Sequence, residues 1–442
     1  MQRMQDTWKN APIDETSAER LASKSLRYAL VDTGDDAALD AWVLADVRGF
    51  HGPAPERERL ERTREFCRQQ RVTGVWPETA SAGAEPVATV SSWIGELTVP
   101  GPAVVEGWAI SSVTVAQTHR GLGIARALLE GELRTAAALD VPYAMLTVSE
   151  STLYGRYGFG NAAGLTDLTF ETSRITWTGP RPAGSLEYVD HAVGAGELER
   201  LHDLARAVDP GDVSTLEGFW QRVTGAHKPD DEQARAKRIV AYRDEHGETT
   251  GVLVYRMSDE PRDFTKHVLT VETLVTTTDD AYAALWRFVL EMPLVATVEA
   301  HLRRLDEPVR WMVGDFRAVK SESYDHHWVR VLDVARALGA RRYGAAGRAV
   351  LDVRDDLGFA SGRYLLEIDA DGDPAVERVD EAPAGTPSIA LDVAALSSIS
   401  LGGVSLDVLA RTGRVDASDP DAVALVDRMF RTPREPWLST WY

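Results

Sequence analysis

The sequence contains almost no cysteine, since Cys67 is the single one among 442 residues. One thiol excludes an intrachain disulfide and any cysteine-rich metal site. No motif surrounds it in "TREFCRQQ", so we predict a buried or helix-face thiol without a catalytic role. The adjacent His326 and His327 have no third ligand at metal spacing, and we predict exposed or interface histidines and no metal site.

Long apolar runs are also missing. No stretch approaches the ~18 consecutive apolar residues of a membrane span. The N-terminal stretch "MQRMQDTWKNAPIDETSAER" lacks the apolar core of a signal peptide. These absences predict a cytoplasmic protein that does not act in a membrane.

Basic side chains are scarce relative to acidic ones. The 48 Lys and Arg residues stand against 68 Asp and Glu residues, which gives a formal net charge of −20. Such a charge repels nucleic acid and anionic membranes, and it raises the local concentration of cationic ligands. We therefore predict amine ligands and no nucleic-acid partner, although solubility alone explains the same charge.

The pattern of apolar residues predicts a mixed α+β chain in three parts, 1–170, 171–325 and 326–442. In the first part we expect the helices to come first, with the strands beginning at "PVATVSSWIGELTV" and "WAISSVTV". A glycine turn, the long helix "GLGIARALLEGELRTAAALD" and the strand "PYAMLTV" follow. This order describes a βαβ unit with a parallel crossover. The second part repeats similar elements without the glycine turn, with a helix expected in "DEQARAKRIVAYRD".

The glycine turn carries the most specific chemical signal. Arg120, Gly121 and Gly123 open a helix directly after a strand, so backbone N–H groups and the helix dipole favour an anion at one point. Glycine-rich turns are also common structural devices. No Gly-Lys-Ser/Thr follows, which argues against a Walker loop for a nucleoside triphosphate. The third glycine of the dinucleotide fingerprint is also absent, which argues against a dinucleotide. The pyrophosphate of coenzyme A remains as the candidate ligand.

Two spaced motifs carry a family resemblance. The stretch "RGLGIA" (120–125) resembles the Arg/Gln-x-x-Gly-x-Gly/Ala signature of GNAT acetyltransferases, which bind acetyl-CoA in that loop. "VAQTHRGLGIARAL" together with "TVSESTLYGRYGFGNAA" resembles the bacterial enhanced-intracellular-survival (Eis) family of N-acetyltransferases. The resemblance implies two tandem GNAT-like domains followed by a domain like sterol carrier proteins. It also implies a homo-oligomer, commonly a hexamer.

The resemblance assigns roles to individual residues. Tyr154 matches the family's general acid, and a phenol of pKa ~10 can deliver a proton to a thiolate. Without its flanking "SE" and "GR", Tyr154 would be an ordinary core aromatic. The positions matching the acetyl-CoA contacts are Val113, Thr114, Val115, Gly121, Leu122, Gly123, Ile124, Ala125, Arg126, Ser149 and Glu150.

The chain ends on "PREPWLSTWY", which is unusually aromatic for a terminus. In Eis-like proteins the terminal carboxylate reaches the active site of the first domain and serves as the base, which assigns that role to Tyr442. A reference pKa of ~3.3–3.7 makes a carboxylate act through water or by positioning the ammonium. Trp437, Trp441 and Tyr442 would anchor the tail; alternatively, the tail simply packs on the third part.

These residues predict an acetyl-CoA-dependent N-acetyltransferase. We expect direct transfer, without a cysteine intermediate, to primary amines of cationic small molecules (aminoglycoside- or polyamine-like) or to lysine side chains. The competing hypothesis is a carrier protein for an apolar ligand, in which the first domain is only structural. The strands in "LEIDADGDPAVERV" and "SIALDVAALSSI" alternate as strands lining a cavity would.

Overall fold

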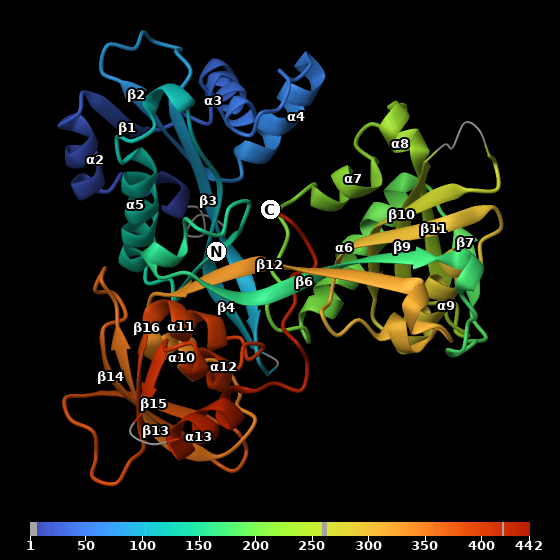
Figure 1. Cartoon of the computed structure of the whole chain (residues 1–442). Coiled ribbons are helices and arrows are strands. Elements are labelled where there is room, and N and C mark those ends of the chain that lie inside the picture. Colours follow the sequence, from blue (N-terminus) through green and yellow to red (C-terminus); the bar gives the residue numbers. More distant parts are fainter. Residues whose placement is uncertain (1–6, 102, 259–262, 418–419) are drawn as a thin grey trace. The chain divides into compact units, whose positions relative to one another are not determined.

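The computed structural model describes residues 7–101, 103–258, 263–417 and 420–442 (Figure 1). The chain folds into two compact units. The first unit comprises residues 1–162, 327–433 and Tyr442, and the second comprises residues 163–326 and 434–441. Within the described ranges, no helix combines the length and the apolar character needed to cross a membrane.

The first unit contains a mixed sheet with the strand order β1-β2-β3-β4-β5-β12. All neighbours in it run antiparallel except β4 and β5, which run parallel and are joined through α5. The predicted βαβ unit is therefore confirmed. Its elements are α2 (Glu15–Ala22), β1 (Leu26–Leu30), α3 (Asp36–Gly49), α4 (Arg57–Cys67), β2 (Arg71–Pro77), β3 (Ala88–Val99), β4 (Ala103–Val115), α5 (Ile124–Ala138), β5 (Tyr143–Thr147) and β12 (Val319–Val331), of which the last residues pair with β5.

The expectation that helices precede all strands is wrong, because β1 lies between α2 and α3. This strand has five residues, and its burial alternates only over the first three of them. So short a strand shows little of the period-2 pattern by which a sequence indicates a strand.

Two hydrophobic layers cover opposite faces of β3. Ala88 and Val90 pack with residues of α5 in one cluster, whereas α3 packs with Val72 of β2 in another. Because side chains alternate along a strand, Thr89, Ser91 and Trp93 lie on the face that α3 covers. Cys67 is buried in the α3 cluster, as predicted.

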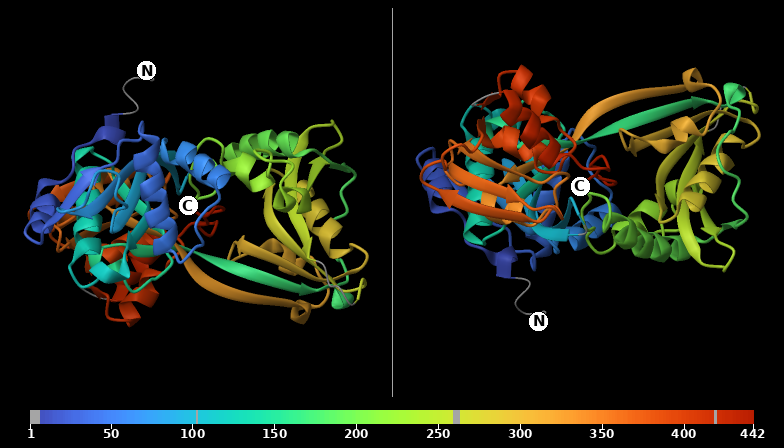
Figure 2. Two further views of the ribbon diagram at one scale, coloured as in Figure 1. Left: turned by 90° about the horizontal axis from the view of Figure 1, so that it is seen from above. Right: turned by 90° about the horizontal axis from the view of Figure 1, so that it is seen from below.

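A five-stranded sheet of order β15-β14-β13-β16-β17 completes the first unit. Helices α11 and α13 contact β13 and β16, and Figure 2 shows the red helices beside the orange strands. The buried side chains of Arg330 on β12 and Asp355 form an ion pair of 2.7 Å inside this unit. The elements are α10 (Val334–Gly339), β13 (Gly347–Arg354), β14 (Gly362–Ile368), β15 (Pro374–Val379), β16 (Ser388–Asp392), α11 (Val393–Ile399), α12 (Leu406–Arg411), β17 (Val415–Ala417) and α13 (Pro420–Phe430).

The second unit repeats the crossover of the first. Its strands follow the order β6-β11-β10-β9-β8-β7, and β10 and β11 run parallel on either side of α9 in sequence. The elements are β6 (Gly160–Glu171), β7 (Ser185–Tyr188), α6 (His191–Arg206), α7 (Phe219–Thr224), α8 (Glu232–Ala236), β8 (Lys237–Arg243), β9 (Thr249–Ser258), β10 (His267–Thr276), α9 (Asp279–Leu290) and β11 (Val295–Arg303).

The helix expected in "DEQARAKRIVAYRD" is wrong in its second half. Helix α8 ends at Ala236, and β8 follows directly. The four apolar residues 239–242 are buried on both faces of the sheet, so tertiary packing overrides the helical tendency of the flanking charged residues. Short 3-10 helices occur at Thr7–Asn10, Gln117–His119, Gly155–Tyr157, Thr172–Arg174, Pro308–Trp311 and Phe316–Ala318.

Candidate active site

The glycine loop forms an open helix N-terminus in the first unit. Gly121 and Gly123 have φ of +79° and +74°, a left-handed conformation that side chains other than glycine rarely adopt. Gly123 is the N-cap of α5, where no side chain caps the helix and no acidic residue stands in the first turn. The first N–H groups of this 15-residue helix therefore remain free to bind an anion.

Lys24 adds a positive charge to this loop. Its Nζ donates a hydrogen bond to the carbonyl of Leu122 and lies 3.6 Å from the point where a Cβ on Gly123 would stand. A lysine beside a helix N-terminus strengthens the attraction for a phosphate group. No sequence signal points to Lys24, because 98 positions separate it from Leu122.

Strands β4 and β5 diverge shortly before the glycine loop. They pair only through Gly107–Ala109 and Tyr143–Met145. Across the described residues, the rest of β4 as far as Val115 has no strand partner on this edge. A register shift opposite β3 and a φ of +56° at Ser112 mark a bulge in this part of β4. The predicted contacts Val113, Thr114 and Val115 thus lie on a strand edge with free backbone groups.

The last residue of the chain lies at the end of β5. The hydroxyl of Thr147 donates a hydrogen bond of 2.5 Å to the backbone oxygen of Tyr442. The Tyr442 ring meets Trp93 edge to face at 5.3 Å, and its hydroxyl lies 3.1 Å from Nε2 of His327. Burial raises the pKa of the Tyr442 phenol well above its ordinary value, so the ring stays neutral.

The prediction of exposed or interface histidines is wrong, because His326 and His327 are both fully buried. In the first unit, Tyr442 packs on His327. In the second unit, Nε2 of His326 lies 2.9 Å from the carbonyl of Thr440, and its ring stacks near that of Trp441. The C-terminal segment covers both imidazoles, which sequence spacing cannot reveal.

Trp437 is the main aromatic anchor of the tail in the second unit. Its backbone N–H donates to the carbonyl of Pro210 at 2.8 Å, and its indole N–H donates to the carbonyl of Leu302 at 3.0 Å. The guanidinium of Arg303 lies 5.3 Å from the ring centroid. Trp441 is held less firmly, since 49% of its surface is exposed.

Buried charges also hold the tail in the second unit. Asp209 accepts hydrogen bonds from Arg304 at 2.8 Å and from Arg434 at 2.7 Å. Asp212 accepts from the backbone N–H and the hydroxyl of Ser439, both at 3.1 Å. Burial alone would raise the pKa of Asp212, but His202 and the Ser439 hydrogen bonds lower it overall. These groups line a cavity of about 470 Å³.

Tyr154 follows β5 in the first unit and is largely buried, with its ring 6.2 Å from that of Phe159. Burial raises the pKa of its phenol, and the nearby Glu150 and Tyr157 add to the increase. Tyr154 therefore carries its proton at neutral pH, as a general acid must.

Of the remaining predicted contacts in the same unit, Leu122, Arg126, Ser149 and Glu150 are exposed, Ala125 is half-buried and Ile124 is buried in the core beside α5. The hydroxyl of Thr152 donates to Glu150 at 3.1 Å. Arg126 pairs with Glu130 at 2.6 Å and leaves 64% of its side chain exposed. The first unit thus brings the glycine loop, the free edge of β4, Tyr154 and Tyr442 into one compact body.

The second unit lacks an equivalent anion site on its own crossover helix. Thr278 caps α9 by accepting a hydrogen bond from the N–H of Ala281. Asp279 and Asp280 occupy the first turn and place negative charge where α5 leaves free N–H groups. A pyrophosphate would be repelled there, so the described residues favour a single acetyl-CoA site in the first unit.

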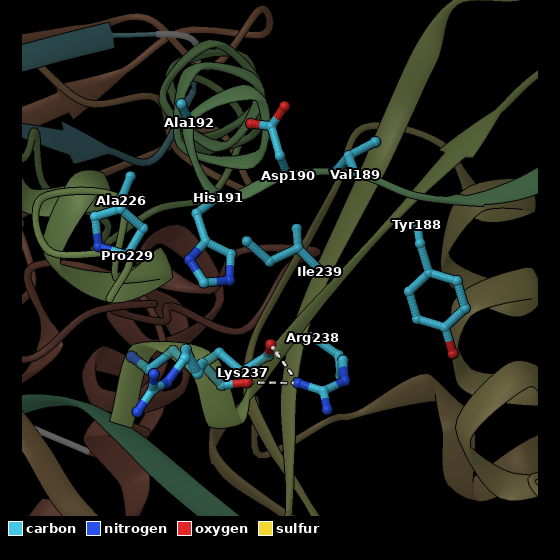
Figure 3. A pocket seen from close by; sticks show the side chains of 11 residues that line it. Tyr188, Val189, Asp190, His191, Ala192, Ala226, Pro229, Lys237, Arg238 and Ile239 are labelled. Carbon is cyan, nitrogen blue, oxygen red and sulfur yellow. Dashed lines mark hydrogen bonds between the residues drawn. The ribbon is translucent and has the colours of Figure 1, made fainter. Parts of the chain in front are cut away.

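A second cavity of the second unit, of about 960 Å³, is shown in Figure 3. None of its lining residues belongs to the glycine loop, the Tyr154 segment or the tail. They are Tyr188, Val189, Asp190, His191, Ala192, Ala226, Pro229, Arg235, Lys237, Arg238 and Ile239.

Comparison with known proteins defines the class of this chain. Models of the acetyltransferase (GNAT) domain match residues 31–162 and 212–331, and a model of the sterol carrier protein domain matches residues 334–439. The fold is thus two tandem GNAT domains followed by a sterol-carrier-like domain. GNAT acetyltransferases take their acetyl group from acetyl-CoA.

Individual relatives narrow the class. An uncharacterized N-acetyltransferase of Streptomyces avermitilis is 35% identical over 358 residues, covering 79% of this chain and 84% of the relative. N-acetyltransferase Eis of Mycobacterium tuberculosis is 27% identical, with coverage of 79% and 84%. The crystal structure of Eis1 from Mycobacterium abscessus superposes with a TM-score of 0.79 at 27% identity, covering 94% of this chain and 100% of that one. The chain belongs to the Eis-like family of GNAT N-acetyltransferases.

Proposed function

We propose that this enzyme transfers an acetyl group from acetyl-CoA directly to a primary amine of a cationic acceptor, either an aminoglycoside- or polyamine-like small molecule or a lysine side chain. The observation that carries the proposal is the hydrogen bond from Thr147 to the backbone oxygen of Tyr442, in the unit that also contains the glycine loop. The net charge of −20 supports a cationic acceptor.

The glycine loop and the free edge of β4 suit the two polar parts of acetyl-CoA. The backbone N–H groups of residues 121–126 and the ammonium of Lys24 would hold the pyrophosphate, and Val113 to Val115 would hold the amides of the pantetheine arm. Ser149 and Glu150 would flank it. Acetyl-CoA supplies the activated acetyl group as a thioester.

Two groups of the chain would manage the protons. The Tyr442 carboxylate would orient the acceptor ammonium and take its proton through a water, because a carboxylate is too weak a base to remove it directly. The Tyr154 hydroxyl would give its proton to the leaving thiolate, for which its raised pKa keeps it protonated. No covalent enzyme intermediate is needed, since the lone thiol, Cys67, is buried.

The proposal is tested by measuring thiol release from acetyl-CoA with aminoglycosides, polyamines and lysine peptides, against a control without amine. We expect release only when an amine is present. If no amine of the panel caused thiol release although acetyl-CoA still bound, the proposed class of amine acceptors would be contradicted. If the protein released no thiol, did not bind acetyl-CoA and co-purified with an apolar ligand, the carrier hypothesis would be favoured.

We further propose a cytoplasmic homo-oligomer, hexameric by family resemblance, without nucleic-acid or membrane partners. Sedimentation of the purified protein tests the assembly, and a monomer at micromolar concentration would contradict it.

A further inference from the structure

A buried carboxylate joins two arginines beside the glycine loop. Glu130 lies on α5 and is only 3% exposed. Its Oε1 accepts a hydrogen bond from Nε of Arg126 at 2.6 Å, and its Oε2 accepts one from Nη1 of Arg20 at 2.8 Å. Burial alone would raise the pKa of Glu130, but the hydrogen bonds from Arg126 and Arg20 lower it overall, so the carboxylate is ionised at neutral pH. Because Arg20 belongs to α2 and Arg126 to α5, Glu130 holds guanidinium groups of two helices close together.

Both guanidinium groups are accessible to a ligand. The side chains of Arg20 and Arg126 are 37% and 64% exposed. Each donates one N–H group to Glu130, whereas an arginine has five. Among the described residues, no second carboxylate pairs with either of them. A third arginine, Arg134, approaches Glu130 to 3.7 Å, but Asp14 pairs with it at 2.9 Å. The cluster therefore has an excess of one positive charge in a chain whose net charge is −20.

The two guanidinium groups lie near the proposed pyrophosphate site. Arg126 stands in the first turn of α5, and its hydrogen bond to Glu130 directs the guanidinium along the flank of that helix. Gly123 and Glu130 are separated by about 10 Å along the helix axis, at 1.5 Å per residue. Arg20 precedes Lys24 on the neighbouring segment, and Lys24 contacts the glycine loop itself. Cationic groups thus extend from the N-terminus of α5 along one side of the helix.

Coenzyme A carries phosphate at two places. Besides the pyrophosphate, its ribose bears a phosphate monoester on the 3′ oxygen, and only the sugar separates the two. A phosphate monoester has a charge of about −1.5 to −2 at neutral pH. The planar guanidinium of arginine suits it, because two parallel N–H groups can bind two phosphate oxygens. A buried ion pair by itself adds little to stability. The burial of Glu130 is therefore better explained by the placement of the two arginines.

We propose that Arg20 and Arg126, held together by Glu130, bind the 3′-phosphate of acetyl-CoA, so that the enzyme selects this substrate over its 3′-dephospho form. This inference rests on the proposed acetyl-CoA site and deepens it. The family resemblance places Arg126 among the acetyl-CoA contacts, whereas nothing in the sequence assigns a role to Arg20 or Glu130. The two arginines are the binding residues, and Glu130 is a positioning residue that fixes their geometry.

The test compares two ligands that differ in one phosphate, coenzyme A and 3′-dephospho-coenzyme A. Isothermal titration calorimetry on the full chain measures the Kd of each. We expect the wild type to bind coenzyme A at least about tenfold more tightly, because charge-assisted hydrogen bonds to one phosphate are worth roughly this factor. In Arg20→Gln the Kd of coenzyme A should rise about fivefold or more, while that of the dephospho form should change less than about twofold.

Glu130→Gln separates the placement of the arginines from their charge. The variant makes the cluster more positive, so charge alone would tighten the binding of coenzyme A. We expect the preference for coenzyme A over the dephospho form to fall instead, because the arginines lose the group that aligns them. Arg20→Lys keeps the charge without the planar group and should retain only part of the preference. Arg57→Gln removes one exposed charge from α4 and is the matched control, for which both Kd values should stay the same.

The outcomes are distinct. If the wild type bound both ligands equally but still released thiol when an amine was present, only this inference would fail. An equal rise of both Kd values in Arg20→Gln would overturn it as well, because Arg20 would then act on the fold or on the ligand as a whole. Tighter binding of coenzyme A by Glu130→Gln would overturn the positioning role of Glu130. If the wild type bound neither ligand, the proposed function would fail together with the inference.

Discussion

Thr147 and Tyr442 are joined by a hydrogen bond of 2.5 Å across 295 positions of sequence. The acceptor is the backbone oxygen of Tyr442, the residue to which the proposed function assigns the role of base through its carboxylate. Trp93 and His327 fix the ring of the same residue. Thr147 therefore holds the backbone oxygen of Tyr442, and Trp93 and His327 hold its ring, within the unit that carries the glycine loop.

Replacing Thr147 by Val removes that hydroxyl without changing the shape of the side chain. We expect kcat to fall about tenfold, because a hydrogen bond to a charged group contributes roughly 1.5–3 kcal/mol. The KM for acetyl-CoA should stay the same. Steady-state kinetics checks this, with Thr63→Val on the exposed face of α4 as the matched control. A kcat equal to that of the wild type would show that Thr147 does not position the carboxylate.

Tyr154→Phe removes the proton donor and leaves the buried ring in place. We expect kcat to fall roughly 10²–10⁴-fold, the usual contribution of a general acid, while acetyl-CoA binding and the melting temperature change little. Tyr157→Phe, three residues away in the same segment, is the control and should retain its activity. Equal rates for both variants would assign the proton donor elsewhere.

Lys24→Gln removes the ammonium beside the glycine loop. We expect the Kd for acetyl-CoA to rise about five- to tenfold and to depend less on ionic strength, because a charged contact to phosphate is lost. Isothermal titration calorimetry measures both this change and the stoichiometry. We expect one acetyl-CoA per chain, since Asp279 and Asp280 block the equivalent helix N-terminus of the second unit. Two molecules per chain would contradict this account of α9.

Asp46 makes stability depend on pH. Its folded-state pKa of about 6 lies above the ordinary 3.8, mainly because of burial. As pH rises, the Asp46 carboxyl loses its proton in the unfolded chain before it does so in the folded one. The free energy of unfolding therefore decreases between pH 3.8 and pH 6, and above pH 6 the full loss amounts to about 3 kcal/mol. Asp46→Asn removes the cost, and its melting temperature should exceed that of the wild type near pH 8 but not near pH 4.

Thermal melts at both pH values check this prediction, with Glu61→Gln, which removes an exposed charge from α4, as the control. A variant less stable than the wild type near pH 8 would show that the Asp46 carboxylate stabilises the fold.

The glycine loop and the βαβ crossover could be predicted from the sequence, because both are local patterns. Gly121 and Gly123 stand at the start of a helix whose period is readable, and the structure keeps them there. The role of Tyr442 came from family resemblance alone, since nothing in a terminal tyrosine indicates what its carboxylate contacts.

Residues brought together over long sequence separations could not be predicted. Lys24 meets Leu122 from 98 positions away, and Asp46 meets Ser112 from another element altogether. The burial of His326 and His327 depends on a C-terminal segment more than a hundred residues later. Such contacts follow from tertiary packing, which a single sequence does not encode in any local pattern.

The most direct test of the central claim is the kcat of a variant with one glycine added after Tyr442. The extension keeps every side chain and converts the Tyr442 carboxylate into a neutral amide. With cadaverine as acceptor, we predict a loss of at least about a hundredfold in kcat, with an unchanged Kd for acetyl-CoA. A kcat equal to that of the wild type would contradict a catalytic role for the terminal carboxylate.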